Sequence, residues 1–278
     1  MKLKKKITLI GLSVLVGGVI YVFLFGKLFP FSPVIIGFEK HELTNTIIYT
    51  QKGLIFNEYE KIDRLVSEVE KFHELSYRKK PKIFLFSDSI SYLRRSLSTK
   101  SRMCAYRNSR IFASPWALKD VQNGKISLEI YLTHELSHTI IQQQLGMVRY
   151  PQWLLEGIAV YCSNQMGTSI YPSKSATYQL IRAGNFMPPN CFRTININKN
   201  EIKLDFETFE EKIGFIYSQF GCMVDYLITI YGKDTFLIYM KKLTKDGNHT
   251  KIFKQTFGIE FDAFLTDFKD YVMNAEQN

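Results

Sequence analysis

The pattern of apolar residues changes about half-way along this chain. The first half contains short runs of β-branched and aromatic residues, which are typical of strands, and the second half repeats apolar residues at helical spacing. Residues 168–204 are expected to be mostly loop with one short helix. Strands followed by helices indicate an α+β fold. Strands are predicted at 46–50, 82–86 and 110–113, and helices at 57–75, 91–95, from Ser114-Pro115 onward, 126–145, 151–163, 214–231, 234–243, 249–257 and 260–273.

The first thirty residues have a different pattern. Residues 7–25 are an unbroken run of 19 residues without a charge, which is about the length that a helix needs to cross a bilayer. Four lysines lie within the first six residues, so the positive-inside rule places the N-terminus in the cytoplasm and the remaining chain outside. A cleaved signal peptide is the alternative, but it would have a shorter apolar region and a small-residue cleavage site. We therefore interpret this run as an uncleaved anchor.

These patterns suggest three parts. Residues 1–28 are expected to hold the cytoplasmic lysines and the transmembrane anchor, and residues 29–45 a juxtamembrane linker. Residues 46–278 would form one domain with two subdomains, about 46–146 and 147–278. A chain of 278 residues that is 46% hydrophobic can support two subdomains that share a cleft.

Charge and cysteine content add little to this picture. The net charge is +10, and no nucleic-acid recognition motif accompanies it, so we expect no nucleic-acid partner. The cysteines show no close-spaced metal pattern, and both disulfides and buried free thiols remain open. The four cysteines are Cys104, Cys162, Cys191 and Cys222.

Candidate chemistry lies inside the helix predicted at 126–145. It contains His134-Glu135-Leu136-Ser137-His138, and histidines four residues apart share one face of a helix. Both imidazoles can therefore bind one metal ion, with Glu135 beside the ion as a general base. The alternative is a solvent-facing helix that carries two histidines.

A third ligand follows 18 residues after His138. Glu156 lies in the segment Trp153-Leu154-Leu155-Glu156-Gly157-Ile158-Ala159. Catalytic zinc usually has three protein ligands and an open fourth position. A carboxylate among apolar neighbours is costly to bury without a counter-charge, which a metal ion would supply. Alternatively, Glu156 faces water at the edge of its helix.

These two segments together resemble the gluzincin metallopeptidases, the thermolysin-like and aminopeptidase-like group. The resemblance implies a zincin-like fold, with a small sheet, an active-site helix and a helical C-terminal subdomain. It implies one Zn²⁺ bound by His134, His138 and Glu156, with Glu135 as catalytic base and a peptide or protein as substrate. Residues 82–86 resemble the opening strand of such domains, and residues 110–114 resemble the strand at the edge of the cleft that pairs with an extended substrate.

The resemblance also extends to 217–227, the helix that follows the site. Tyr217 is the candidate oxyanion donor by its place in that helix, although a core tyrosine fits equally. Position 160 is Val160, where thermolysin-type enzymes have an aspartate, so the partner of a zinc histidine is unassigned. No aminopeptidase motif is evident, and endopeptidase and exopeptidase activity both remain open.

The sequence therefore predicts a membrane-anchored zinc peptidase that acts outside the membrane. An inactive surface-binding protein with the same fold is one alternative, and the intact Glu135 argues against it. A zinc amidohydrolase that acts on a non-peptide amide is the other. His41, His73 and His249 are expected to be structural or exposed rather than ligands.

Overall fold

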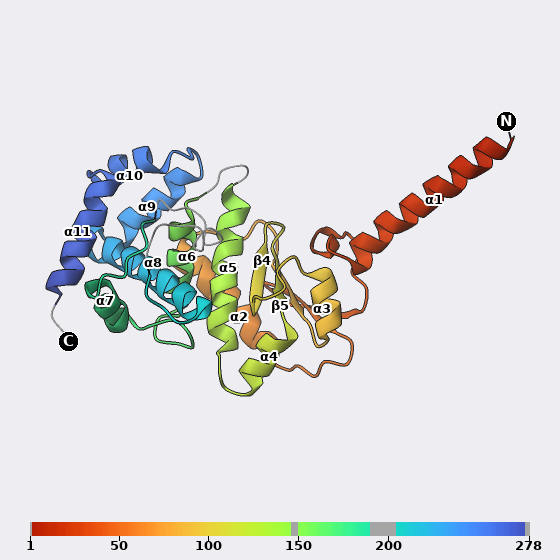
Figure 1. The fold of residues 1–278 in the computed structure, drawn as a ribbon, viewed down its shortest axis with the longest axis horizontal. Helices are drawn as coiled ribbons and strands as arrows, with labels where there is room; N and C mark the ends of the chain where they lie inside the picture. The colour runs from red at the N-terminus through yellow and green to blue at the C-terminus, as the bar shows by residue number, and fades with distance from the viewer. Residues whose placement is uncertain (1, 146–149, 190–203, 276–278) are drawn as a thin grey trace.

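The computed structural model describes residues 2–145, 150–189 and 204–275, with side chains described from residue 10 onward apart from Leu145. A sheet and its covering helices form the first half of the chain, and a group of helices forms the second (Figure 1). The architecture is therefore mixed α+β, as the sequence predicts.

Among the described residues, the sheet has five strands in the order β1-β2-β3-β5-β4. The three inner strands are parallel, and the two outer strands are antiparallel to their neighbours. Side chains alternate between its faces: Ile83 and Leu85 join the main core, whereas Phe84 joins a separate aromatic cluster. The strands are β1 (Phe38–Glu42), β2 (Ile47–Gln51), β3 (Lys82–Leu85), β4 (Met103–Tyr106) and β5 (Arg110–Ala113).

The aromatic face of the sheet is covered by the segment that follows the N-terminal helix. Phe29, in the short 3-10 helix η1 (Phe29–Phe31), is fully buried there, and Arg110 Nη1 donates to its carbonyl at 2.9 Å. We predicted a juxtamembrane linker at 29–45, but these residues include η1 and strand β1. The burial of Phe29 and the pairing of β1 with β2 make this segment part of the domain.

Helices pack against the opposite face of the sheet. α2 (Tyr59–His73) and α5 (Leu128–Leu145) pack there and bury Val66, Leu132 and Leu136 in the main core. Two shorter helices, α3 (Ser89–Arg95) and α4 (Pro115–Gln122), follow strands β3 and β5. Ser114 caps α4 by accepting from the backbone N–H of Ala117, as the Ser-Pro pair predicts.

The second half is helical. α8 lies at its centre and packs against α6. The last three helices, α9, α10 and α11, lie on the side of this half that is away from the sheet (Figure 1). A capping box between Thr208 and Glu211 starts α8 at residue 209, before the predicted start at 214. The helices are α6 (Gln152–Cys162), α7 (Lys174–Arg182), α8 (Phe209–Tyr231), α9 (Lys233–Leu243), α10 (His249–Phe257) and α11 (Phe261–Asn274).

Helix α1 (Lys2–Phe25) projects away from the rest of the molecule (Figure 1). By length and composition, α8 is the helix within the described part of the chain that is long and apolar enough to span a membrane. However, 67% of its apolar window is buried inside the protein, so α8 is a core helix. The described apolar stretch of α1, Ile10–Phe25, is shorter.

The structure confirms the strands predicted at 46–50, 82–86 and 110–113 and adds β1 and β4, which the sequence analysis missed. It also confirms a helix across each range predicted as helical, with shifts at the ends. The segment at 168–204, predicted as loop with one short helix, contains the helix α7, and residues 190–203 lie outside the described residues. Cys104, Cys162 and Cys222 are free thiols, whereas Cys191 lies outside the described residues.

Candidate metal centre

Helix α5 presents two imidazoles on one face. His134 and His138 are one helical turn apart, and their Nε2 atoms lie 3.1 Å from each other. Their rings meet edge to face at 84°. His134 is buried and His138 is half-buried, so both nitrogens are largely withdrawn from solvent.

Helix α6 brings a carboxylate to the same place. Glu156 Oε2 lies 3.4 Å from the Nε2 atom of each histidine. The next residue, Gly157, lies against α8, where an added Cβ would be 2.5 Å from the carbonyl oxygen of Phe220. A glycine is needed for this close approach of two helices, and the approach fixes the position of Glu156.

These three donor atoms fit a zinc ion. Tetrahedral zinc binds nitrogen and oxygen ligands at about 2.0–2.1 Å, which places the ligands about 3.3 Å from one another. The observed separations are 3.1, 3.4 and 3.4 Å. Two histidines and one glutamate are also a donor set of catalytic zinc sites. The three residues line a cavity, so a fourth position would be accessible to water or substrate.

The electrostatics of Glu156 also suit a metal ligand. Burial alone would raise the pKa of its carboxyl group. The interactions with His138 and His134 outweigh burial, so the pKa lies well below its usual range. Glu156 is therefore an ionised carboxylate at neutral pH, which is the form that binds a cation.

Glu135 faces the same cavity but does not belong to the group of potential ligands. Burial raises the pKa of its carboxyl group to about 7, and the nearby charge of Glu156 acts in the same direction. His134 and a hydrogen bond from the backbone N–H of Ala105 oppose this shift. A carboxyl group with a pKa near neutral can both accept and release a proton, which is what a general base requires.

The cavity has a volume of about 490 Å³, within the usual range for a binding site. Strand β4 lines it with Met103, Cys104 and Ala105. β4 is an outer strand of the sheet, and β5 is its partner strand among the described residues. Its other edge is open apart from the Ala105 N–H, which donates to Glu135. We predicted that residues 110–114 form the strand at the edge of the cleft, which was wrong. They form β5 instead, an inner strand that is fully buried between β3 and β4.

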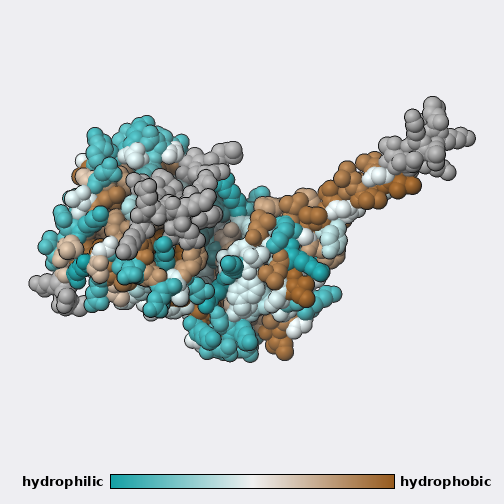
Figure 2. All heavy atoms as spheres, viewed as in Figure 1, coloured by the Kyte–Doolittle hydropathy of each residue, from teal (hydrophilic) through white to brown (hydrophobic). Residues whose placement is uncertain are grey.

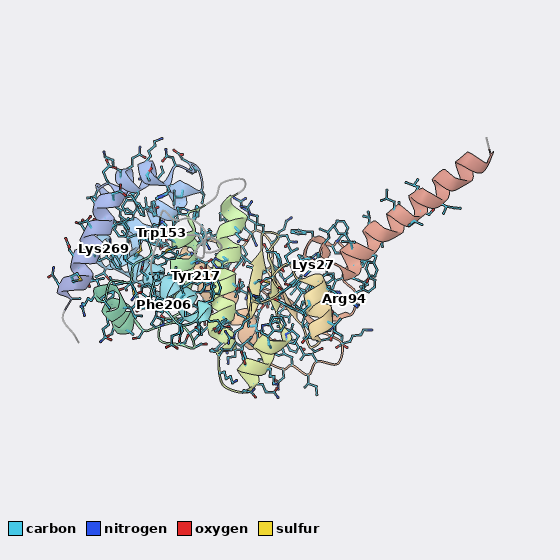
Figure 3. All side chains as sticks on the ribbon, viewed as in Figure 1. Lys27, Arg94, Trp153, Phe206, Tyr217 and Lys269 are labelled. Atoms are coloured by element: carbon cyan, nitrogen blue, oxygen red, sulfur yellow. The ribbon has the colours of Figure 1, made fainter. Side chains whose placement is uncertain are left out.

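Tyr217 lies on α8, where Figure 3 labels it, and lines the cavity. Its ring lies nearly parallel to that of His134, at 8°, with the ring centroids 6.4 Å apart. Tyr171 lines the same cavity, with its ring centroid 6.4 Å from that of Tyr217. Tyr171 had no sequence signal, because it lies in a segment without a regular pattern.

Val160 is fully buried, so position 160 supplies no polar partner to a metal-binding histidine. Within the described part of the chain, the buried Nδ1 atom of His134 has no hydrogen-bond partner. Behind α5, His73 Nε2 lies 2.9 Å from Ser137 Oγ, and burial lowers the pKa of His73 to about 3. His73 is therefore a neutral, structural histidine, as the sequence predicts.

The other two histidines also lie away from the metal centre. His41 Nε2 is 3.1 Å from Thr50 Oγ1, and its ring stacks on Tyr59. His249 packs edge to face against Phe261 at the start of α10. Neither belongs to the group of potential ligands found among the described residues.

No protein-family model and no curated protein matches this chain. Similar solved structures include three crystal structures of the M1 zinc metallopeptidase from Deinococcus radiodurans: a mutant bound to a Tyr-Ser-Ala substrate, the mutant alone, and a third structure whose description names no mutation. Their TM-scores are 0.46, 0.45 and 0.44, at 14%, 13% and 13% identity. They cover 84%, 85% and 84% of this chain, which spans about half of theirs: 50%, 51% and 49%. Similarity at this level leaves the function to be argued from the geometry of the site.

Proposed function

We propose that this chain is a zinc-dependent peptidase, anchored in a membrane, that hydrolyses peptide bonds outside the membrane. The observation that carries the proposal is the triangle formed by His134, His138 and Glu156. Its dimensions fit one Zn²⁺, and a carboxyl group that is not a ligand, Glu135, lies beside it in an accessible cavity. Bound zinc would supply Lewis-acid activation of water and of the scissile carbonyl group.

Two side chains would carry out the remaining steps, proton transfer and stabilisation of the oxyanion. Glu135 would accept a proton from the attacking water and return it to the leaving amine, and its pKa near 7 supports both transfers. Tyr217 would donate a hydrogen bond to the oxyanion of the tetrahedral intermediate.

Strand β4 supports a peptide substrate rather than a small amide. An extended peptide can add to the open edge of a sheet through main-chain hydrogen bonds. β4 has such an edge and lines the cavity. A peptide on β4 would have its scissile bond held close to Glu135, because the Ala105 N–H of β4 already contacts that carboxylate.

The membrane anchor is proposed for α1. Its large apolar side chains from Ile10 to Phe25 are mostly exposed, for example Val14 at 70% and Leu15 at 64%. Such a surface is unfavourable in water and favourable in lipid. The lysines before residue 7 favour a cytoplasmic N-terminus, which would place the site on the opposite side of the membrane.

Metal analysis of the purified full-length chain, combined with a peptide-library digest, tests the proposal. We expect about one zinc per chain and hydrolysis that a chelator abolishes and added zinc restores. His138→Ala should lose most of the zinc, because two remaining ligands seldom hold a catalytic ion tightly. His41→Ala, which changes a histidine outside the site, is the matched control and should keep it. Stoichiometric zinc in the His138→Ala variant would show that the site is elsewhere.

A further inference from the structure

Side-chain contacts with α3 hold the C-terminal end of α1 against the domain. Lys27 Nζ donates to the carbonyl oxygens of Leu93 and Ser96, at 2.6 and 2.7 Å, at the C-terminal end of α3. The guanidinium group of Arg95 lies 4.6 Å from the ring centroid of Phe29 and 5.5 Å from that of Phe25. Both contacts join α1 or its extension to α3, so the direction of α1 sets the orientation of the whole domain.

Apolar surface surrounds these contacts. Figure 2 shows hydrophobic surface on the described part of α1 and again at its base. On α3, Ile90 and Leu93 are three residues apart and share one face, with exposures of 61% and 42%. Isolated exposed apolar residues are common, but a group that continues an apolar helix marks an interaction surface. The large apolar residues exposed around these contacts are Leu28, Phe31, Val34, Ile90, Leu93 and Leu97.

A groove between α1 and α3 adds positive charge to this surface. It has a volume of about 260 Å³, and Tyr21 and Phe25 form one wall, with Arg94 and Arg95 on the other. Arg94 is exposed and follows Leu93, whose carbonyl oxygen accepts from Lys27 at the end of α1. Figure 3 labels Arg94 and Lys27. Asp88 also lines the groove, but its carboxylate caps the opposite end of α3 by accepting from two backbone N–H groups.

The position of this surface along α1 matches the headgroup region of a bilayer. An apolar run of 19 residues is about 28 Å long as a helix, close to the thickness of the hydrocarbon core of a membrane. If α1 spans the membrane, the run ends at residue 25, two residues before Lys27. The groove and the exposed apolar residues would then lie among the lipid headgroups, where aromatic and basic side chains are favoured.

We propose that α3 and η1 form a docking surface for anionic phospholipids, which holds the domain against the outer face of the membrane. The apolar residues enter the interface, and the positive charge of Arg94 is attracted by the net negative charge of the headgroup. A bilayer is the occupant that fits, because the surface is continuous with α1 and combines apolar with cationic side chains. This inference rests on the proposed anchoring by α1 and is independent of the proposed hydrolysis.

Fluorescence quenching of the full-length chain in lipid nanodiscs tests the docking. Ile90→Trp places a reporter on α3, and Ile238→Trp is the matched control at an exposed position on α9 (48% exposed). The unsubstituted chain gives the background from Trp116 and Trp153. A quencher carried on the lipid headgroup should reduce the emission of the reporter at position 90 and leave the control unchanged. Equal quenching at both positions would overturn the docking, whereas vesicle flotation reports the anchoring separately.

Lipid selectivity is tested with the quencher on phosphatidylglycerol or on phosphatidylcholine, at equal mole fraction. We expect stronger quenching of the Ile90→Trp reporter by the anionic lipid, with an enrichment of up to about fivefold. Adding Arg94→Gln should bring the two lipids to equal quenching, whereas Arg64→Gln, at an exposed arginine of α2, should keep the difference. Equal quenching by both lipids before Arg94 is changed would overturn the anionic preference.

Discussion

Two glutamates that line one cavity have carboxyl pKa values shifted in opposite directions. Glu156 is ionised because two histidines face it, whereas burial keeps the pKa of Glu135 near 7. The sequence predicted this division between ligand and base from the positions of the residues alone. The pKa values could not be predicted, since they depend on burial and on the Ala105 N–H from a strand that the sequence analysis missed.

Glu135→Gln and Glu156→Ala should therefore have different effects. Glu135→Gln should retain zinc and the thermal stability of the fold while kcat falls by about 10²–10⁴, because the base is lost and no ligand is removed. Glu156→Ala should weaken zinc binding, since it removes a ligand. Zinc content, melting temperature and hydrolysis of one confirmed substrate should be measured for each. Near wild-type turnover by Glu135→Gln would exclude this carboxylate as the base.

The Tyr217→Phe variant tests whether Tyr217 acts as the oxyanion donor or serves only as a core tyrosine. The ring remains beside His134, so we expect zinc content and stability to be unchanged. Loss of the hydroxyl group should lower kcat by about 10²–10³. Tyr161→Phe, on α6 and outside the residues that line the cavity, is the matched control. A Tyr217→Phe variant with unchanged kcat would assign Tyr217 to the core.

At the scale of elements, the inner strands and long helices could be predicted, and the outer strands could not. After Lys82 and Arg110 at their starts, β3 and β5 are continuous apolar runs because neighbours cover both of their faces. β1 has the sequence Phe-Glu-Lys-His-Glu, and charges are typical of strands at the edge of a sheet. β4 is four residues long and contains Cys104 and Ala105, so its conformation comes from pairing with β5.

The contact between α6 and α8 depends on Gly157. Gly157→Ala should destabilise the fold by about 1–3 kcal/mol, because the added methyl group meets the backbone carbonyl of Phe220. Displacement of α6 should also weaken zinc binding through the adjacent Glu156. Gly17→Ala is the matched control, since an added Cβ on this helical glycine of α1 would meet no described atom within 4 Å outside its own stretch of helix. Denaturant unfolding and zinc titration check both effects, and wild-type values for Gly157→Ala would contradict the packing argument.

At the scale of the whole molecule, the structure has two unequal cores, and the site lies where the sheet half meets the helical half. The sequence predicted strands followed by helices, and the three proposed ligands lie on helices that are consecutive in the chain. It did not predict that residues 29–45 belong to the domain. Phe29 is buried by contacts with strands far along the chain, which no local pattern reveals.

The proposed topology predicts that α1 remains in the mature protein. Membrane fractions of expressing cells should contain a chain that begins near Met1, and the end of the chain near Asn278 should be accessible from outside. N-terminal sequencing and protease protection of intact cells measure these two properties. A soluble, secreted form that begins shortly after Gly26 would show instead that α1 is a signal peptide.

The core helix α8 has a consequence for the passage of this chain across a membrane. Before it folds, α8 is an apolar segment of spanning length, and an export channel could release it sideways into lipid. Two polar residues oppose this: Gln219, which binds the backbone of Met187 in the fold, and Asp225, which pairs with Lys174 at 2.5 Å. An aspartate within such a segment disfavours insertion by about 2.5–3.5 kcal/mol. If the domain is exported as proposed, the residues that anchor α8 in the core also allow it to complete the crossing.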